Sequence, residues 1–90
     1  MKKRSFKAGE IFHSELQSDG VRIRLVVLID LEGWLAGIGY LDANEWITKG
    51  VYPEVEDAKR VAEGYARTVL GIKSKIEWLP GPMTLSGDSE

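Results

Sequence analysis

The sequence predicts an α+β fold, in which an antiparallel meander of three or four strands is followed by one amphipathic helix packed on one face and by a short C-terminal strand or extended segment. Two observations predict it: β-branched residues alternate from 21 to 30, and the apolar period becomes helical from 54 to 70. Ninety residues make one domain. We expect a basic flexible arm over 1–9, the domain over 10–79 and a flexible tail over 80–90.

The strands are separated by short stretches of turn residues such as "QSDG", "DLEG" and "DANE". Short connections of this kind join neighbouring antiparallel strands. Proline cannot donate to a strand ladder, so Pro53 ends the sheet. The expected strands are a weak edge strand over 10–16, the clearest strand over 21–30, and two more over 34–41 and 46–52.

The helix is expected over 54–70. Acidic residues crowd its first turn, where they complement the helix dipole, and Gly71 stands where a left-handed C-terminal cap belongs. Beyond it, "KIEWL" (75–79) is expected to pack Trp78 on the core. The predicted contact places Val55, Ala58, Ala62, Tyr65 and Val69 of the helix against Trp34, Ala36 and Ile38 of the sheet.

The composition restricts the classes of protein. The chain has no cysteine, so there is no disulfide framework and no thiolate chemistry. Its longest apolar run, over 25–29, is far shorter than the roughly 20 residues of a membrane span, so we expect no membrane partner. The basic start is followed by Ala8, Gly9 and Glu10 rather than an apolar stretch, unlike a secretory signal, which favours a cytoplasmic location.

The residues that carry most enzyme chemistry are sparse. His13 is the single histidine, and we interpret it as an ordinary surface residue because no second histidine or cysteine completes a site. The glycines of "GIGYLD" (37–42) lack the third glycine and the helix of a dinucleotide fingerprint, and "GIKS" (71–74) follows a helix instead of preceding one. We therefore expect no catalytic residue, no cofactor and no metal site, and a protein that is not an enzyme.

Several stretches resemble the DNA-binding domain of the plant ethylene-response-factor family, and similar sheet-plus-helix domains bind DNA arms in some integrases. The similar stretches are "GVRIR" (20–24), "GWLAGI" (33–38), Trp46 and the alanine-rich segment 56–80. The resemblance implies a three-stranded sheet that lies in the major groove, with Arg22 and Arg24 facing nucleic acid. The chain departs from the family on its second strand, where charged DNA-contacting residues are replaced by Leu35, Gly37 and Gly39.

Those two glycines interrupt a strand, which indicates that something approaches its backbone closely. By strand alternation Leu35, Gly37 and Gly39 share the outer face, away from the helix. An apolar patch there has the character of an interaction site. The alternative is that the N-terminal segment, with Ile11, Phe12 and Leu16, folds over and covers this face. The candidate partner-binding residues are Val26, Leu28, Leu35, Gly37, Gly39 and Leu41.

Two functions remain. The first is protein association through the outer face, either as a homodimer or as an accessory, inhibitor or antitoxin-like protein. The second is DNA binding through the sheet and the basic arm. Residues 8–79 carry eight basic and twelve acidic side chains, which disfavours nucleic acid, so protein binding is the favoured hypothesis. The candidate nucleic-acid residues are Lys2, Lys3, Arg4, Lys7, Arg22 and Arg24, of which the first four also suit a solvated tail.

Overall fold

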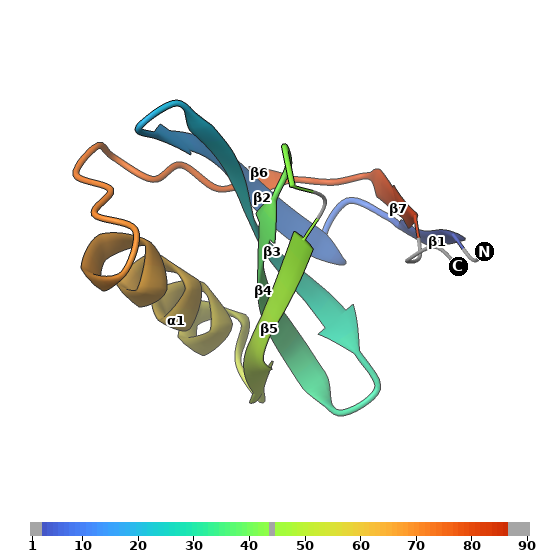
Figure 1. Ribbon diagram of the computed structural model, residues 1–90. Coiled ribbons are helices and arrows are strands. Elements are labelled where there is room, and N and C mark those ends of the chain that lie inside the picture. Colours follow the sequence, from blue (N-terminus) through green and yellow to red (C-terminus); the bar gives the residue numbers. More distant parts are fainter. Residues whose placement is uncertain (1–2, 44, 87–90) are drawn as a thin grey trace.

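The computed structural model describes residues 3–43 and 45–86, which form a five-stranded antiparallel sheet, one helix and a small two-stranded ribbon (Figure 1). This is the α+β fold that the sequence predicts. The elements are β1 (Lys3–Phe6), β2 (Ile11–Ser18), β3 (Val21–Asp30), β4 (Gly33–Tyr40), β5 (Glu45–Tyr52), α1 (Val55–Thr68), β6 (Leu79–Pro80) and β7 (Met83–Ser86).

The large sheet has the strand order β5-β4-β3-β2-β6, so four consecutive strands form a meander. The strand β3 has the expected bounds, and β4 and β5 begin one residue earlier than expected. The first strand differs from its prediction as a weak edge strand. It has 8 residues, pairs with β3 along its whole length, and pairs with β6 on its other side through Phe12 and His13.

The helix α1 covers one face of the sheet over β3, β4 and β5 (Figure 1). Its fully buried residues are Ala58, Ala62 and Ala66, whose small side chains let the helix lie close to the strands. Ala58 packs with Val27 and Ala36. At 14 residues, this helix of the described chain is too short and too polar to cross a membrane.

The predicted contact of Val69 with the sheet is wrong. The helix ends at Thr68 and the Val69 side chain is 61% exposed. The chain reverses at Gly71, whose φ of 70° is in the region that favours glycine. Ile72 then donates its N–H to the carbonyl of Ala66 and enters the core in place of Val69.

The segment after the helix closes the core, as expected. Trp78 packs against both clusters beneath the helix, and its Nε1 donates to the Glu63 carboxylate over 2.6 Å. The ammonium group of Lys59 lies 4.3 Å from the ring centroid of Phe12. The chain then joins the sheet at β6.

Residues 3–6 and 83–86 form strands where the sequence predicts a flexible arm and a flexible tail, while residues 1–2 and 87–90 of those predictions lie outside the described residues. The strands β1 and β7 pair with each other in an antiparallel ribbon, on the opposite side of the sheet from α1 (Figure 1). Phe6 of β1 is buried against Val26 and Leu28, and Met83 of β7 packs on the same cluster. The pairing joins opposite ends of the chain, so local sequence patterns do not reveal it.

Candidate protein-binding surface

The glycines of β4 lie under an aromatic ring. Gly37 pairs with Thr48 and Gly39 with Trp46 across the β4–β5 ladder, and both glycines are buried. A Cβ atom on Gly37 would stand 2.3 Å from Cζ2 of Trp46, and one on Gly39 would stand 3.0 Å from its Cε3. The close approach that the sequence indicates is therefore made by the protein's own indole ring.

The predicted apolar patch is mostly covered by the chain itself. Val26 and Leu28 are buried under the β1–β7 ribbon, and Leu35 is half-buried in the same cluster. Leu41 lies in the turn after β4, where its N–H donates to the carbonyl of Arg22. With both glycines buried beneath Trp46, the six candidate partner-binding residues do not form one open surface.

The N-terminal segment with Ile11, Phe12 and Leu16, the alternative cover that the sequence suggests, does not cover this face. That segment is β2, a strand of the sheet. Ile11 does face the outer cluster, whereas Leu16 packs in the core under the helix and Phe12 contacts Lys59 of α1. The cover consists instead of the ribbon and Trp46.

The two arginines of the nucleic-acid hypothesis both pair with carboxylates. Two nitrogen atoms of the Arg22 guanidinium group, Nε and Nη2, donate to Oδ1 of Asp42 over 3.1 and 2.8 Å. This hydrogen bonding lowers the pKa of Asp42 and raises that of Arg22. Arg24 donates from Nε and Nη2 to Oε2 of Glu15 over 3.0 and 2.5 Å. A phosphate or base would have to displace these carboxylates.

The basic arm is placed only in part. Lys3 and Arg4 belong to β1, and Lys7 is exposed after it. The backbone N–H of Lys7 donates to Oε1 of Glu10 over 2.8 Å. Lys2 lies outside the described residues.

Exposed apolar side chains of the sheet occur along β5, and also at Val21 and Ile29 of β3 and at Leu79 of β6. On the outer face Trp46 is 45% and Val51 is 40% exposed, with exposed Thr48 between them. The strand is at one end of the sheet, and within the described chain it pairs only with β4. We call Trp46, Thr48, Val51 and the unpaired edge of this strand the β5 surface.

A bulge limits the regular part of this edge. The register shifts between Ala36 and Gly37, so that Lys49 is the extra residue of β5. The Lys49 carbonyl accepts a hydrogen bond from the hydroxyl of Tyr52 over 2.9 Å. The edge is therefore regular from Glu45 to Thr48 and bends beyond that point.

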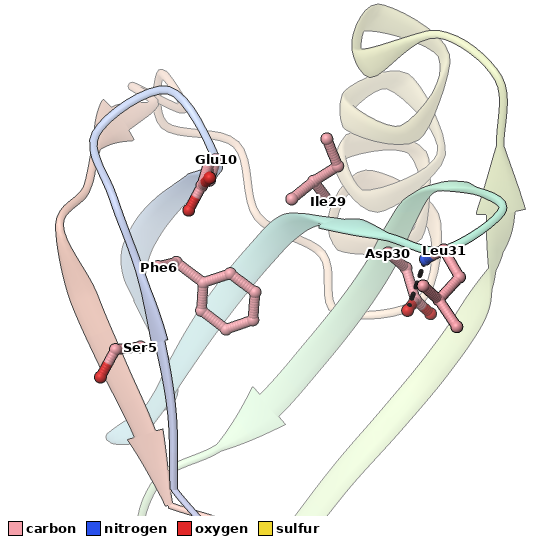
Figure 2. A pocket seen from close by; sticks show the side chains of 6 residues that line it. All are labelled: Ser5, Phe6, Glu10, Ile29, Asp30 and Leu31. Carbon is pink, nitrogen blue, oxygen red and sulfur yellow. Dashed lines mark hydrogen bonds between the residues drawn. The ribbon is translucent and has the colours of Figure 1, made fainter.

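A hollow of about 450 Å³ opens between β1 and the β3–β4 turn (Figure 2). Its two carboxylates already accept backbone hydrogen bonds, Glu10 from Lys7 and Asp30 from the N–H of Leu31 over 2.8 Å. Leu31 at the rim is 99% exposed. The hollow is lined by Ser5, Phe6, Glu10, Ile29, Asp30 and Leu31, which pair no nucleophile with a base.

A second hollow, of about 390 Å³, lies beside His13, Lys75 and Glu77. The Nδ1 atom of His13 is buried there without a hydrogen-bond partner among the described residues. Over residues 3–43 and 45–86, no three histidine, cysteine or acidic side chains gather as metal ligands would.

Comparison of the chain with protein-family models, with curated proteins and with solved structures gave no match.

Proposed function

We propose that the chain is a non-catalytic protein-binding module that contacts its partner through the β5 surface. One observation carries this proposal: an exposed tryptophan stands on an edge strand of 8 residues that has no second neighbour in the described chain. Unpaired N–H and C=O groups of an edge strand are a template for another strand. Tryptophan is enriched among the residues that contribute most to protein interfaces.

The charges of the chain support a protein partner over nucleic acid. Residues 8–79 are acidic, with eight basic and twelve acidic side chains. Arg22 and Arg24 are both engaged by carboxylates, Asp42 and Glu15, within 3.1 Å. A protein surface tolerates this balance, whereas a phosphate backbone needs unpaired cations.

The test places a photo-crosslinking residue, p-benzoylphenylalanine, at Thr48 and, as a matched control, at Val69. Both positions are exposed, but Val69 lies beyond the end of α1 and away from the β5 surface. Irradiation of native cells and of the purified chain should give protein adducts from position 48 and not from position 69. The absence of any adduct at position 48, including one with a second copy, would contradict the proposal.

A salt series with duplex DNA tests the other hypothesis. Binding that weakens steeply with salt and is reduced by Arg22→Gln or Arg24→Gln would favour DNA binding through the sheet. Under the present proposal we expect no such binding. Photo-adducts that persist while DNA is not bound would separate the two functions.

A further inference from the structure

We infer that the partner at the β5 surface is a second copy of this chain, and that the two β5 strands pair antiparallel about a two-fold axis at Ile47. The inference rests on the proposed function and names its partner. Two five-stranded sheets would then form one continuous sheet with both helices on the same face.

Backbone geometry restricts where the axis can lie. In an antiparallel pair, residues directly opposite each other both point their backbone groups toward the partner strand, or both point them away. Two copies of one strand therefore pair only in registers where one residue stands directly opposite its own copy, with the two-fold axis between them. An axis at Thr48 would bring the Lys49 bulge into the centre of the ladder. An axis at Ile47 keeps the centre within the regular stretch of the edge.

The charges beside Ile47 are complementary in this register. Glu45 pairs with Tyr40 on the helix side of the sheet, and the Lys49 ammonium group lies 4.7 Å from the ring centroid of Tyr65 on α1. Neither Glu45 nor Lys49 forms an ion pair with another described residue. Glu45 and Lys49 each lie two residues from Ile47, on opposite sides of it. Glu45 of each copy therefore faces Lys49 of the other copy, and the dimer contains this pair twice. Opposite charges directly across a ladder stabilise it.

On the outer side of the same ladder, the Trp46 side chain meets the second copy while its ring stays over the glycines of β4. Trp46 would stand opposite Thr48 of the second copy, again twice, so each indole ring gains a neighbour along the edge. The regular ladder spans only Trp46 to Thr48 on each chain, with Glu45 and the bulge residue Lys49 opposite each other at its two ends. An interface of this length is small, so we expect a reversible dimer that forms as the protein concentration rises.

A charge-exchange experiment tests the partner and the register together. Glu45→Lys and Lys49→Glu each place like charges opposite each other in the homodimer, and each should raise the dimer dissociation constant by about tenfold. An equimolar mixture of the two variants restores both opposite-charge pairs and should associate about as well as the original chain. Sedimentation of the separate and mixed variants measures this, with circular dichroism as a check that each is folded. Failure of the mixture to recover association would overturn the Ile47 register.

A cysteine at the axis gives a second, independent readout, because the chain has no cysteine of its own. In the proposed register the two copies of Ile47→Cys have Cα atoms about 4.5 to 5.5 Å apart, within reach of a disulfide. Two copies of Thr48→Cys, the control, are offset by two residues along the strands and lie about 8 Å apart, beyond that reach.

The expected result is rapid oxidation of the folded Ile47→Cys protein to a covalent dimer, with little from Thr48→Cys. Crosslinking at position 48 in preference to 47 would overturn the register. A chain that sediments as a monomer at every concentration, with no crosslink at either position, would overturn the second copy as partner. In that case the proposed function still stands if position 48 gives photo-adducts with a different protein, and falls if it gives none.

Discussion

Trp46 stands over Gly37 and Gly39 as an aromatic ring that covers two glycines across a strand pair. A strand glycine offers no side chain to pack, and a cross-strand ring restores that contact. The register is set by the turn between the strands, since Tyr40 pairs with Glu45 and therefore Gly39 with Trp46. The short turn that contains "DANE" fixes which residues of the two strands lie opposite each other. Its length was therefore a signal in the sequence that predicts Trp46 opposite Gly39.

Gly37→Ala should lower the free energy of unfolding by about 1–3 kcal/mol, because the added Cβ would stand 2.3 Å from the Trp46 ring. Chemical denaturation measures the change. The control is Gly64→Ala in α1, where an added Cβ meets nothing within 4 Å and where the helix should gain about 0.5–1 kcal/mol. A neutral Gly37→Ala would contradict the packing described for Trp46.

The hydroxyls of Tyr40 and Tyr65 lie 3.3 Å apart, and this hydrogen bond, with burial, raises the pKa of Tyr40 to about 12. The folded protein holds the Tyr40 proton more tightly than the unfolded chain does, so this contribution to stability is complete below pH 10 and declines as the pH rises toward 12.

Tyr65→Phe should therefore lower the pKa of Tyr40, as followed by the ¹³Cζ shift of its ring in an NMR titration. Tyr52→Phe is the control, since the Tyr52 hydroxyl donates to the Lys49 carbonyl instead. An unchanged Tyr40 pKa in Tyr65→Phe would show that burial, and not the hydrogen bond, is the main cause.

At the scale of the elements, α1 packs on the sheet through alanines at positions 58, 62 and 66. Their spacing of four residues puts them on one side of the helix, and their size brings the backbone close to β3 and β4. Larger apolar residues, Val55, Val61 and Tyr65, flank this contact and are partly exposed. The helix is therefore sensitive to the size and charge of side chains along one narrow line.

Ala62→Asp should destabilise the protein by several kcal/mol, roughly 3 or more, because the carboxylate would be buried without a partner among Ile23, Leu25 and Ile38. Thermal and denaturant unfolding measure the loss. Val69→Asp introduces the same group at a 61% exposed position and should change the stability little. Equal effects of the two substitutions would contradict the assigned helix face.

On the scale of the whole molecule, the sheet has a cover on each side. The helix and the segment through Trp78 cover one face, while β1 and β7 cover part of the other. Because β1 and β7 come from opposite ends of the described chain, their pairing ties both ends to the domain. The β5 surface is among the parts of the sheet that remain exposed.

Phe6→Ala should cost about 3 kcal/mol of stability, since Phe6 is 6% exposed and packs on Ile11, Val26 and Leu28. It should also increase the binding of a dye such as ANS, which reports apolar surface. Ser5→Ala in the same strand is the control, because it removes only an exposed hydrogen bond to Thr84. A small effect of Phe6→Ala, equal to that of Ser5→Ala, would contradict the role of the ribbon as a cover.

Because Phe6 packs in the outer cluster, the charges of the basic arm are best tested by a point substitution and not by a deletion. Deleting residues 2–7 would remove Phe6 together with the cations, so a loss of binding would have two causes. Lys7→Gln removes one exposed charge after the end of β1 and leaves Phe6 in place. If duplex DNA binds through Lys7, this variant should reduce the slope of log affinity against log salt concentration by about one unit. If the chain binds protein as proposed, we expect neither the original chain nor the variant to bind DNA.

The α+β class, the bounds of β3 and the existence and position of α1 could be predicted from the sequence, because alternation and helical period act between residues a few positions apart. Three contacts are visible only in the folded chain: Phe6 and Met83 cover Val26, Trp46 lies on the glycines, and Asp42 and Glu15 engage the arginines. These contacts join strands that are adjacent only once the chain is folded. The outer face of the sheet is apolar because the β1–β7 ribbon and Trp46 bury most of it in the folded chain.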